Sequence, residues 1–320
     1  MNDRPSFPRA ALRTSRAVLI ALALLAVGST RHAGAQTADT LVVGTYAYGS
    51  VDRVGAVTPL AEHLGARLGR PTRVVAAPDP VALAQLVRRG LVDVVVTNTF
   101  GYLILADGAQ PAAIPVATFR IPPGVRTNYG AVVVARDTGM RSVEDVAARA
   151  ASLRMALVAP GSTTGNLVPR LFLAAGGLPE LEDRLRSVTY GGTHAATFAL
   201  LDSGEVDVAA LATEEYERQV ARYGVNAVSR FAVLWQSPDI QLGPVAVRTT
   251  LPVALRDSIA RAVIGLERDA PAAFAALRGG WVEAAKSDAL VAAHDGTYDE
   301  VRRLFGSGNT ITALIARFGR

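Results

Sequence analysis

The chain has 320 residues, no cysteine and a formal net charge of +5 at pH 7, and half of its residues are hydrophobic. Without cysteine it forms no disulfide, zinc–thiolate site or thiol nucleophile. The positive charge does not indicate nucleic-acid binding, because no basic stripe with interleaved aromatic residues accompanies it. A chain of this length suits one large or two moderate domains.

Residues 1–35 have the parts of an export signal. Arginines give a positive start, 17–27 is a short apolar core, and Ala33-Gly34-Ala35 supplies small residues before Gln36. The apolar run is too short to span a bilayer comfortably, and no cysteine follows it for lipid attachment. We therefore expect cleavage near Ala35-Gln36 and a location in the periplasm. Cleavage there removes five arginines and one aspartate and leaves a net charge of +1.

The segment that follows alternates apolar runs with amphipathic ones. Buried strands are predicted for 40–45, 72–77 and 92–97, and helices for 59–68 and 80–89. Thr58 is the expected N-cap of the first helix, and Pro59 is its expected first residue. Short, continuously apolar strands that alternate with helices predict a mostly parallel sheet flanked by helices.

The same alternation returns in the middle of the chain and then gives way to helices. Strands are predicted near 112–119, 128–135, 155–159, 187–190, 231–235 and 245–248, and a turn and strand over 204–211. Helices are predicted for 142–151, 166–175, 193–202, 214–223, 252–266, 269–278, 282–294, 297–305 and 309–317. We therefore expect a second α/β block and then a helical C-terminal region.

Two sequences of the same form occur at 90–96 (GLVDVVV) and 204–210 (GEVDVAA). Each follows a predicted helix and opens a predicted strand, so we expect them at equivalent points of two α/β lobes. Asp207 should then cap or orient its turn, as its counterpart Asp93 does.

Extended segments near 126–130 and 234–238 bracket the second block, as two crossings between lobes would. They predict one lobe from 36–128 plus 236–320 and a second lobe from 129–235. The alternative is one continuous large sheet.

A run of hydroxyl residues lies between two glycines within 160–169 (PGSTTGNLVP). The run follows a predicted strand and precedes a predicted helix, so Ser162, Thr163 and Thr164 should stand at a helix N-terminus. Unpaired backbone N–H groups and the positive end of the helix dipole suit such a position to an oxyanion. The alternative is an ordinary N-cap, for which one hydroxyl is enough.

Four further pieces occur in order: YGAVVVARDTG (129–139), SVEDV (142–146), PGSTTGNLVP (160–169) and YGGTHAAT (190–197). With the two strand openings, they resemble the substrate-binding proteins of phosphonate, phosphite and phosphate ABC transporters over residues 40–305. The resemblance implies an α/β type II periplasmic binding protein fold, with two lobes, two crossover strands and closure around a ligand by hinge motion. It also implies a monomeric receptor that passes a small anionic ligand to an ABC permease, without cofactor, metal site or catalytic residues.

The resemblance further implies which residues bind the ligand. The family's serine–threonine–serine cradle falls on Ser162, Thr163 and Thr164, with threonine in place of the usual last serine. The family's histidine falls on His194, at the start of a predicted helix, where a bound dianion would favour the protonated form. The alternative for His194 is a residue at a helix start that contacts no ligand.

The family also has aromatic residues at the binding site, and for two of these positions this chain offers two candidate residues each. The first loop offers Tyr46 or Tyr48. The residues after the third strand offer Phe100, which could not hydrogen-bond through its side chain, or Tyr102. Tyr129 lies on the first crossing, where it faces the ligand or packs in the hinge strand.

Asn98, at the end of the third strand, and Glu214, after a strand of the second lobe, are further candidates. Family members that bind aminoalkylphosphonates use carboxylates to hold the ammonium. Glu214 and Glu215 could equally open a helix, where acidic residues are favoured. The sequence therefore does not identify the organic substituent of the ligand.

The sequence also bears on three other functions. The same donors would suit sulfate or a sulfonate, so a sulfonate-type receptor is the alternative within the class. A sensory receptor for a membrane kinase would use the same lobes for a different purpose. A hydrolase is not expected, because no Gly-x-Ser-x-Gly turn surrounds Ser162 and no carboxylate is placed to orient His194.

Overall fold

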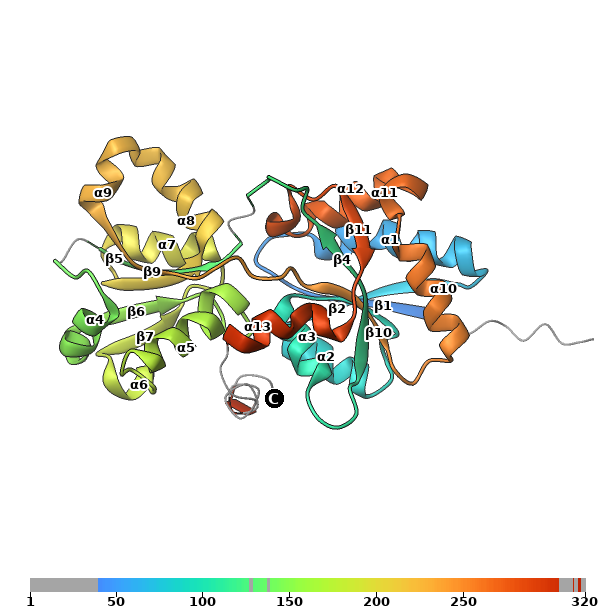
Figure 1. Ribbon diagram of the computed structural model, residues 1–320, viewed down its shortest axis with the longest axis horizontal. Coiled ribbons are helices and arrows are strands. Elements are labelled where there is room, and N and C mark those ends of the chain that lie inside the picture. The colour runs from blue at the N-terminus through green and yellow to red at the C-terminus, as the bar shows by residue number, and fades with distance from the viewer. Residues whose placement is uncertain (1–39, 127–128, 137–138, 305–312, 314–315, 318–320) are drawn as a thin grey trace, which may run out of the picture. The chain divides into compact units, whose positions relative to one another are not determined.

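The computed structural model describes residues 40–126, 129–136, 139–304, 313 and 316–317. The predicted export signal at 1–35 lies outside these residues, as do most of the predicted helix at 309–317 and part of the crossing at 126–130. Asp39–Arg320 forms one compact unit that holds two sheets with helices packed on them (Figure 1). Within the described ranges, every helix is too short or too polar to span a bilayer.

We call the six-stranded sheet and the helices on it lobe one. Its strands are β1 (Leu41–Tyr46), β2 (Thr72–Ala77), β3 (Val94–Val96), β4 (Ala113–Arg120), β10 (Pro244–Arg248) and β11 (Ala289–Ala292). Their order across the sheet is β11-β4-β10-β3-β1-β2. β1 pairs in parallel with β2 and β3, whereas β10 and β11 pair antiparallel with their neighbours. The predicted parallel arrangement therefore holds for the first three strands.

Lobe one carries helices from both ends of the chain. They are α1 (Arg53–Leu68), α2 (Pro80–Arg88), α3 (Thr99–Ala106), α10 (Val253–Val263), α11 (Leu266–Asp269), α12 (Pro271–Gly279) and α13 (Asp299–Leu304), with 3₁₀ turns η4 (Val282–Ala284) and η5 (Asp295–Tyr298). The predicted start of α1 at Pro59 is wrong. Asp52 caps the helix instead, accepting a hydrogen bond of 2.8 Å from the Gly55 N–H, and Pro59 lies inside the helix.

We call the five-stranded sheet and its helices lobe two. Its strands are β5 (Ala131–Arg136), β6 (Arg154–Leu157), β7 (Ser187–Tyr190), β8 (Val208–Ala212) and β9 (Phe231–Gln236), in the order β7-β6-β8-β5-β9. β6 is parallel to β7 and β8, and β5 is antiparallel to β8 and β9. Two separate sheets contradict the alternative of one continuous sheet.

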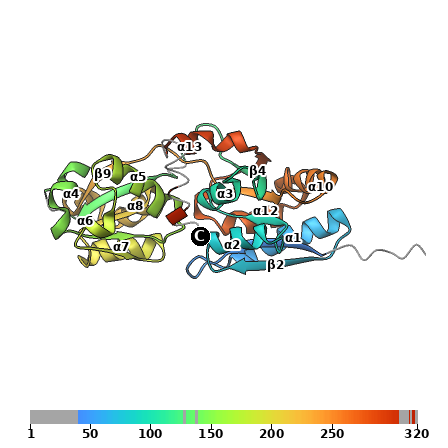
Figure 2. The ribbon, with the colours of Figure 1, turned by 90° about the horizontal axis from the view of Figure 1, so that it is seen from below.

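The helices of lobe two group around this second sheet in both ribbon views (Figure 2). They are α4 (Val143–Arg149), α5 (Val168–Ala175), α6 (Leu181–Arg184), α7 (His194–Ser203), α8 (Thr213–Val220) and α9 (Ala227–Arg230). Shorter turns precede or follow them: η1 (Ala150–Ser152), the π-helical η2 (Thr163–Leu167) and η3 (Ala221–Asn226). Helices thus follow most strands of this lobe, as the sequence pattern predicts.

The predicted helix at 282–294 is wrong. After the turn η4, residues Ala289–Ala292 form strand β11, which pairs antiparallel with β4 at the edge of the sheet of lobe one. The alanine-rich sequence favours a helix locally, but pairing with β4 and burial of Leu290, which is 1% exposed, decide the outcome. An ion pair between Arg120 and Asp288 (2.9 Å) lies where this pairing begins.

Asp93 and Asp207 occupy equivalent positions in the two lobes, as predicted. Asp93 accepts hydrogen bonds from the backbone N–H of Val42 (2.9 Å) and from the guanidinium of Arg248 (2.6 Å). Asp207 accepts from the backbone N–H of Arg154 (2.9 Å) and from its guanidinium (2.8 Å). Each aspartate therefore ties the entry to its own strand to the start of the neighbouring parallel strand.

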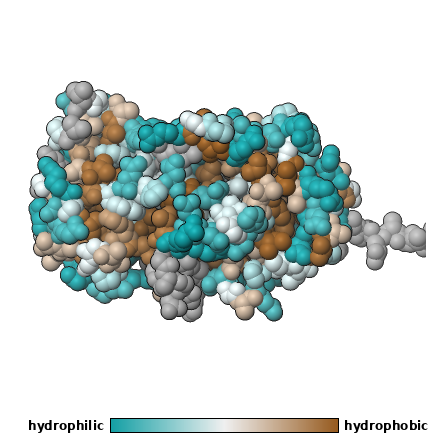
Figure 3. Space-filling model, viewed as in Figure 1, coloured by the Kyte–Doolittle hydropathy of each residue, from teal (hydrophilic) through white to brown (hydrophobic). Residues whose placement is uncertain are grey.

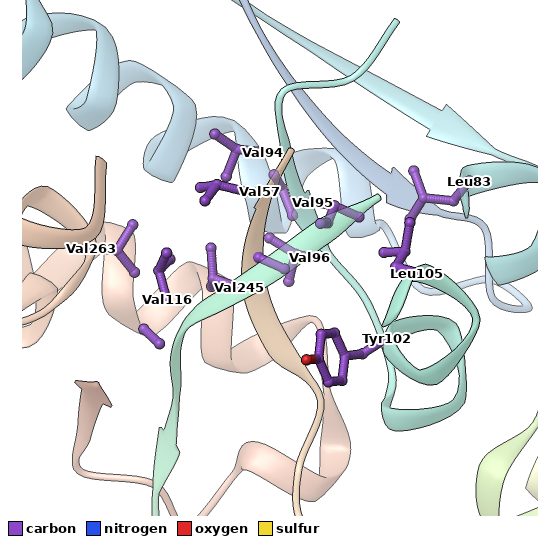
Figure 4. Packing of buried hydrophobic residues seen from close by; sticks show 14 of the residues in the cluster. Val57, Leu83, Val94, Val95, Val96, Tyr102, Leu105, Val116, Val245 and Val263 are labelled. Atoms are coloured by element: carbon purple, nitrogen blue, oxygen red, sulfur yellow. The ribbon is translucent and has the colours of Figure 1, made fainter. Parts of the chain in front are cut away.

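The core of lobe one surrounds β3. Val94, Val95 and Val96 are at most 2% exposed and pack with Val57 of α1 and Val245 of β10 (Figure 4). On the outside, small hydrophobic groups lie between hydrophilic ones on the face shown in Figure 3. Scattered apolar residues of this kind are normal on protein surfaces and identify no binding face.

Candidate functional site

A cavity of about 1080 Å³ lies between lobe one and lobe two. Each of the six parallel strands (β1–β3 and β6–β8) leads into a helical segment whose cap or first turn lines this cavity. The lining residues at these starts are Arg53 of α1, Asp79 of α2, Asn98 of α3, Thr163 of η2, His194 of α7 and Glu214 of α8. Helix starts direct backbone N–H groups and the positive ends of their dipoles outward, so this position suits an anion.

The three hydroxyl residues line the cavity at the start of η2. Ser162 is the N-cap, and its Oγ accepts a hydrogen bond from the Gly165 N–H at 3.1 Å. Thr163 Oγ1 accepts from the backbone N–H of Phe100 in lobe one at 3.1 Å. In both cases the hydroxyl oxygen is the acceptor, so its own O–H remains a donor.

Polar contacts from both lobes hold the loop before these hydroxyls. The Gly161 carbonyl accepts from Asn98 Nδ2 of lobe one at 3.0 Å, and the Pro160 carbonyl accepts from Asn166 Nδ2 at 2.7 Å. Asn166 Oδ1 in turn accepts from Arg170 Nε at 2.7 Å. Asn166 and Arg170 are four residues apart on one helix face, which is the signal that could have identified them from the sequence.

The glycine after the hydroxyls is required by packing. A Cβ at Gly165 would lie 2.2 Å from Cγ2 of Val158, a residue that is fully buried at the end of the strand segment. The chain therefore turns from β6 into η2 with no room for a side chain there. This close approach brings the backbone N–H groups and hydroxyls of the turn to the cavity wall.

His194 lines the cavity in its uncharged form. Its Nδ1 accepts a hydrogen bond of 3.0 Å from the Ala212 N–H, and because that backbone group only donates, the ring proton belongs on Nε2. Burial lowers the pKa of His194 to about 4. Without ligand, Nε2–H is therefore a neutral donor, and protonation of His194 beside a bound dianion stays a prediction.

Three predicted tyrosines line the cavity: Tyr46, Tyr48 and Tyr129. The sequence left Tyr46 and Tyr48 as alternatives, and the structure brings both to the wall. Tyr48 Oη accepts from the backbone N–H of His194 at 3.2 Å, which links the first loop of lobe one to α7 of lobe two. Burial raises the pKa of Tyr48 to about 12 and also raises the pKa of Tyr46 and Tyr129, so all three phenols keep their protons.

Tyr102 and Phe100 do not contribute side chains to the cavity wall. Tyr102 is 1% exposed and packs in the core of lobe one (Figure 4), where its Oη donates to Asp295 at 2.5 Å and its ring lies 4.5 Å from that of Tyr298. The expectation that Tyr102 faces the ligand is corrected on this ground. The ring of Phe100 is likewise 1% exposed, and only its backbone N–H reaches the hydroxyl loop.

Arg53 is a cavity residue that sequence reasoning missed. Its guanidinium lies 4.1 Å from the ring centroid of Tyr46, 4.5 Å from that of Trp281 and 5.0 Å from that of Tyr48. Arg53 Nε donates to the Gly280 carbonyl at 3.2 Å. No local pattern marks this site, because the loop after β1 and the segment before η4 are more than 200 residues apart.

Two carboxyl groups also line the cavity, Glu214 from lobe two and Glu283 from lobe one. Burial raises the pKa of Glu214 to about 8, and the nearby Glu283 contributes to the rise. Burial likewise raises the pKa of Glu283, against the opposing effect of Arg53. At neutral pH the Glu214 side chain is therefore largely protonated, which limits the negative charge on the wall. Within the described ranges, no cluster of three or more acidic, histidine or cysteine side chains could hold a metal ion.

Comparison with known proteins gives the family from the sequence. The model of the periplasmic substrate-binding proteins of phosphonate ABC transporters matches residues 43–294. The phosphonates-binding periplasmic protein of Escherichia coli K12 is 26% identical over 204 residues, which cover 63% of this chain and 58% of that relative. The alignment thus spans less than two thirds of that relative's length.

Two solved structures have the same fold. One is the binding-protein component of an ABC phosphonate transporter from Pseudomonas aeruginosa (TM-score 0.63, 20% identity, 87% of this chain and 95% of that chain). The other is PhnD1 from Prochlorococcus marinus in complex with methylphosphonate (TM-score 0.63, 17% identity, 85% of this chain and 98% of that chain). The fold is that of the type II periplasmic binding proteins. Because the family model covers most of the chain, the protein belongs to the family of periplasmic substrate-binding proteins of phosphonate ABC transporters, a family of binding proteins and not of enzymes.

Proposed function

We propose that the protein is a receptor that binds a small phosphorus oxyanion in the cavity and delivers it to an ABC permease of the inner membrane. The observation that carries the proposal is the convergence of a hydroxyl loop and helix starts from both lobes on one cavity. Neutral N–H and O–H donors satisfy the oxygens of a bound anion without burying many full charges. Family membership supports the same role.

The residues that we assign to the ligand come from both lobes. They are Ser162, Thr163, Thr164 and His194 of lobe two, and Tyr46, Tyr48 and Tyr129 of lobe one and the first crossing, with Asn98 and Glu214 as further contacts. Hydroxyl groups and the Nε2–H of His194 act as donors in this arrangement. Phe100 and Tyr102 are left out, because their side chains lie in the core.

We further propose that the lobes, 36–128 plus 236–320 and 129–235, close on the ligand as a monomer after removal of residues 1–35 in export to the periplasm. The two crossings run together, which supports a common hinge. The Ser237 N–H donates to the Ala131 carbonyl at 2.8 Å, and the Ile240 N–H donates to the Tyr129 carbonyl at 2.7 Å. Motion about such a pair of connections is the usual way in which these folds close.

A ligand panel with matched variants tests the proposal. Methylphosphonate, phosphite, phosphate, sulfate and taurine would each be added to the purified protein in a thermal-shift assay, followed by calorimetry. A ligand present at about 100 times its dissociation constant adds about 2.7 kcal/mol of stability. We expect a stabilising shift with at least one phosphorus compound. Shifts with only sulfate or taurine would contradict the phosphorus assignment and favour a sulfonate-type receptor.

Thr164 gives the sharpest variant pair. Thr164→Val keeps the shape of the side chain and removes its hydroxyl, so we expect the affinity for the phosphorus ligand to fall roughly 10- to 100-fold, the range for one hydrogen bond to a charged group. Thr164→Ser keeps the hydroxyl and should retain the affinity. Equal binding by both variants would show that the Thr164 hydroxyl does not bind the ligand.

A further inference from the structure

Arg53 is a buried cation with unused hydrogen-bonding capacity in the cavity wall. It is 5% exposed, and among the described residues its Nη1 is buried without a hydrogen-bond partner. Trp281, on the same wall, has its indole Nε1 in the same condition. The phenol of Tyr46 interacts with both side chains, but its oxygen makes no hydrogen bond of good geometry with Arg53 Nη1 or Trp281 Nε1. A buried donor without a full hydrogen bond costs free energy, so an acceptor supplied by a ligand would stabilise this wall.

The guanidinium is held in one orientation. Rings of Tyr46, Trp281 and Tyr48 surround it at 4.1, 4.5 and 5.0 Å, and its Nε is fixed on the Gly280 carbonyl. These contacts use the faces and one edge of the group, while Nη1 makes none of the described hydrogen bonds. A fixed guanidinium is suited to a carboxylate or phosphate, because its planar donors match their paired oxygens.

The charges on the cavity wall of lobe one also favour an anionic ligand group. Glu283 interacts electrostatically with Arg53, and burial raises the pKa of Glu283 and of Glu214, which favours their uncharged forms. The rings of Tyr46 and Trp281, which could attract a ligand ammonium, are already in contact with the guanidinium of Arg53. The wall of lobe one therefore presents a buried cation beside a carboxyl whose negative charge is disfavoured by burial.

We infer that Arg53 forms a second anion-binding subsite in the cavity, and that the ligand is an organophosphonate whose substituent carries a second anionic group such as a carboxylate. The inference rests on the proposed function for the phosphonate end, which the hydroxyl loop of lobe two binds. A cavity of about 1080 Å³ has room for such a substituent, because sites of roughly 300–1,000 Å³ already enclose drug-sized molecules.

Three phosphonates of similar size test the inference by isothermal titration calorimetry. Ethylphosphonate has a neutral substituent, 2-aminoethylphosphonate a cationic one and phosphonoacetate an anionic one. We expect the wild-type protein to bind phosphonoacetate at least about tenfold more tightly than ethylphosphonate, and 2-aminoethylphosphonate no more tightly than ethylphosphonate. Equal affinities, or the tightest binding for the amine, would overturn the inference and leave the proposed function standing.

Variants of Arg53 assign the preference to this residue. Arg53→Met keeps the apolar stem and should bring the ratio of the affinities for phosphonoacetate and ethylphosphonate close to one. Arg67→Met, an exposed arginine on the same helix, removes the same charge and should leave the preference intact. If Arg53→Met does not fold, Arg53→Lys is measured in its place. Lysine keeps the positive charge, so this variant should retain part of the preference for phosphonoacetate over ethylphosphonate.

Two outcomes separate this inference from the proposed function. If ethylphosphonate binds and phosphonoacetate binds no more tightly, only the role of Arg53 is contradicted. A failure of all three phosphonates to bind contradicts the proposed function itself. A preference for phosphonoacetate that persists in Arg53→Met also overturns the inference, since the second anion would then lie elsewhere.

Discussion

Lobe one and lobe two have the same scaffold and different binding surfaces. At the amino ends of their parallel strands, Asp93 and Asp207 make matching bonds to the neighbouring strand and to an arginine. At the carboxyl ends, lobe two places hydroxyls and His194 on the cavity, whereas lobe one places aromatic rings and Arg53 there. The repeated scaffold therefore brings two sets of helix starts together, and we propose that the residues on the two sets bind different parts of the ligand.

The cavity walls of the two lobes also differ in the hydrogen bonds that hold them. In lobe two, Glu182, Arg170 and Asn166 form a chain of hydrogen bonds that ends on the Pro160 carbonyl beside the hydroxyl loop. In lobe one, Asn98 caps α3 through the Gly101 N–H and donates once across to Gly161. We therefore expect substitutions in the two walls to differ in size and in kind.

Asn166→Leu should have the largest effect. Asn166 is fully buried, and the substitution removes its hydrogen bonds with the Pro160 carbonyl and with Arg170 Nε, so we expect the free energy of unfolding to fall by about 3 kcal/mol. Urea denaturation measures this change. The matched substitution in lobe one, Asn98→Leu, removes a helix cap and the hydrogen bond to the Gly161 carbonyl, and should cost about 2 kcal/mol. Equal losses would contradict the difference between the two walls.

Glu214→Gln should change the pH dependence of stability by an intermediate amount. The pKa of Glu214 rises from 4.5 to about 8 on burial, so the folded protein binds more protons than the unfolded one between these values, and stability falls as pH increases through that window. Glutamine does not ionise, so we expect the variant to melt a few degrees above the wild type at pH 8 and by a smaller margin at pH 5.

Two other groups bear on this comparison. His194 has its pKa lowered to about 4, so it reduces stability as the pH falls below about 6.5, but it does so in both proteins and cancels in their difference. The difference between the thermal melts of the two proteins from pH 5 to 8 therefore reports Glu214 together with its neighbour Glu283, whose pKa is also raised by burial. A constant difference in melting temperature across this range would show that Glu214 is ionised in the folded protein.

Asp93→Asn and Asp207→Asn should have the smallest effects and test the repeated scaffold. Each removes the charge from a partly buried ion pair, so we expect a loss of about 1 kcal/mol, with the greater loss at Asp93, whose side chain is 12% exposed compared with 25% for Asp207. Asp257→Asn, an exposed residue on α10, is the control. A loss at only one of the two sites in urea denaturation would contradict the equivalence of the lobes.

Local sequence signals predicted much of this arrangement. Apolar runs identified the parallel strands, and the GxVD repeats identified the equivalent strand openings of two lobes. The hydroxyls between Gly161 and Gly165 identified the cavity loop, because both the cap geometry and the anion chemistry are encoded within a few residues.

Features that depend on distant contacts could not be predicted in this way. Strand β11 exists because its edge pairs with β4, against the helical preference of its alanines. Tyr102 turned out to lie in the core because a hydrogen bond to Asp295 satisfies its hydroxyl there. Arg53 faces the cavity only because Trp281 and Gly280, from the far end of the chain, enclose it.

A crystal structure of the protein with phosphonoacetate tests the division between the lobes most directly. We predict that the phosphonate oxygens lie within hydrogen-bond distance of the hydroxyls of Ser162, Thr163 and Thr164, and that the carboxylate lies on Arg53. A ligand in the reverse orientation, or a carboxylate that points away from Arg53, would contradict the account.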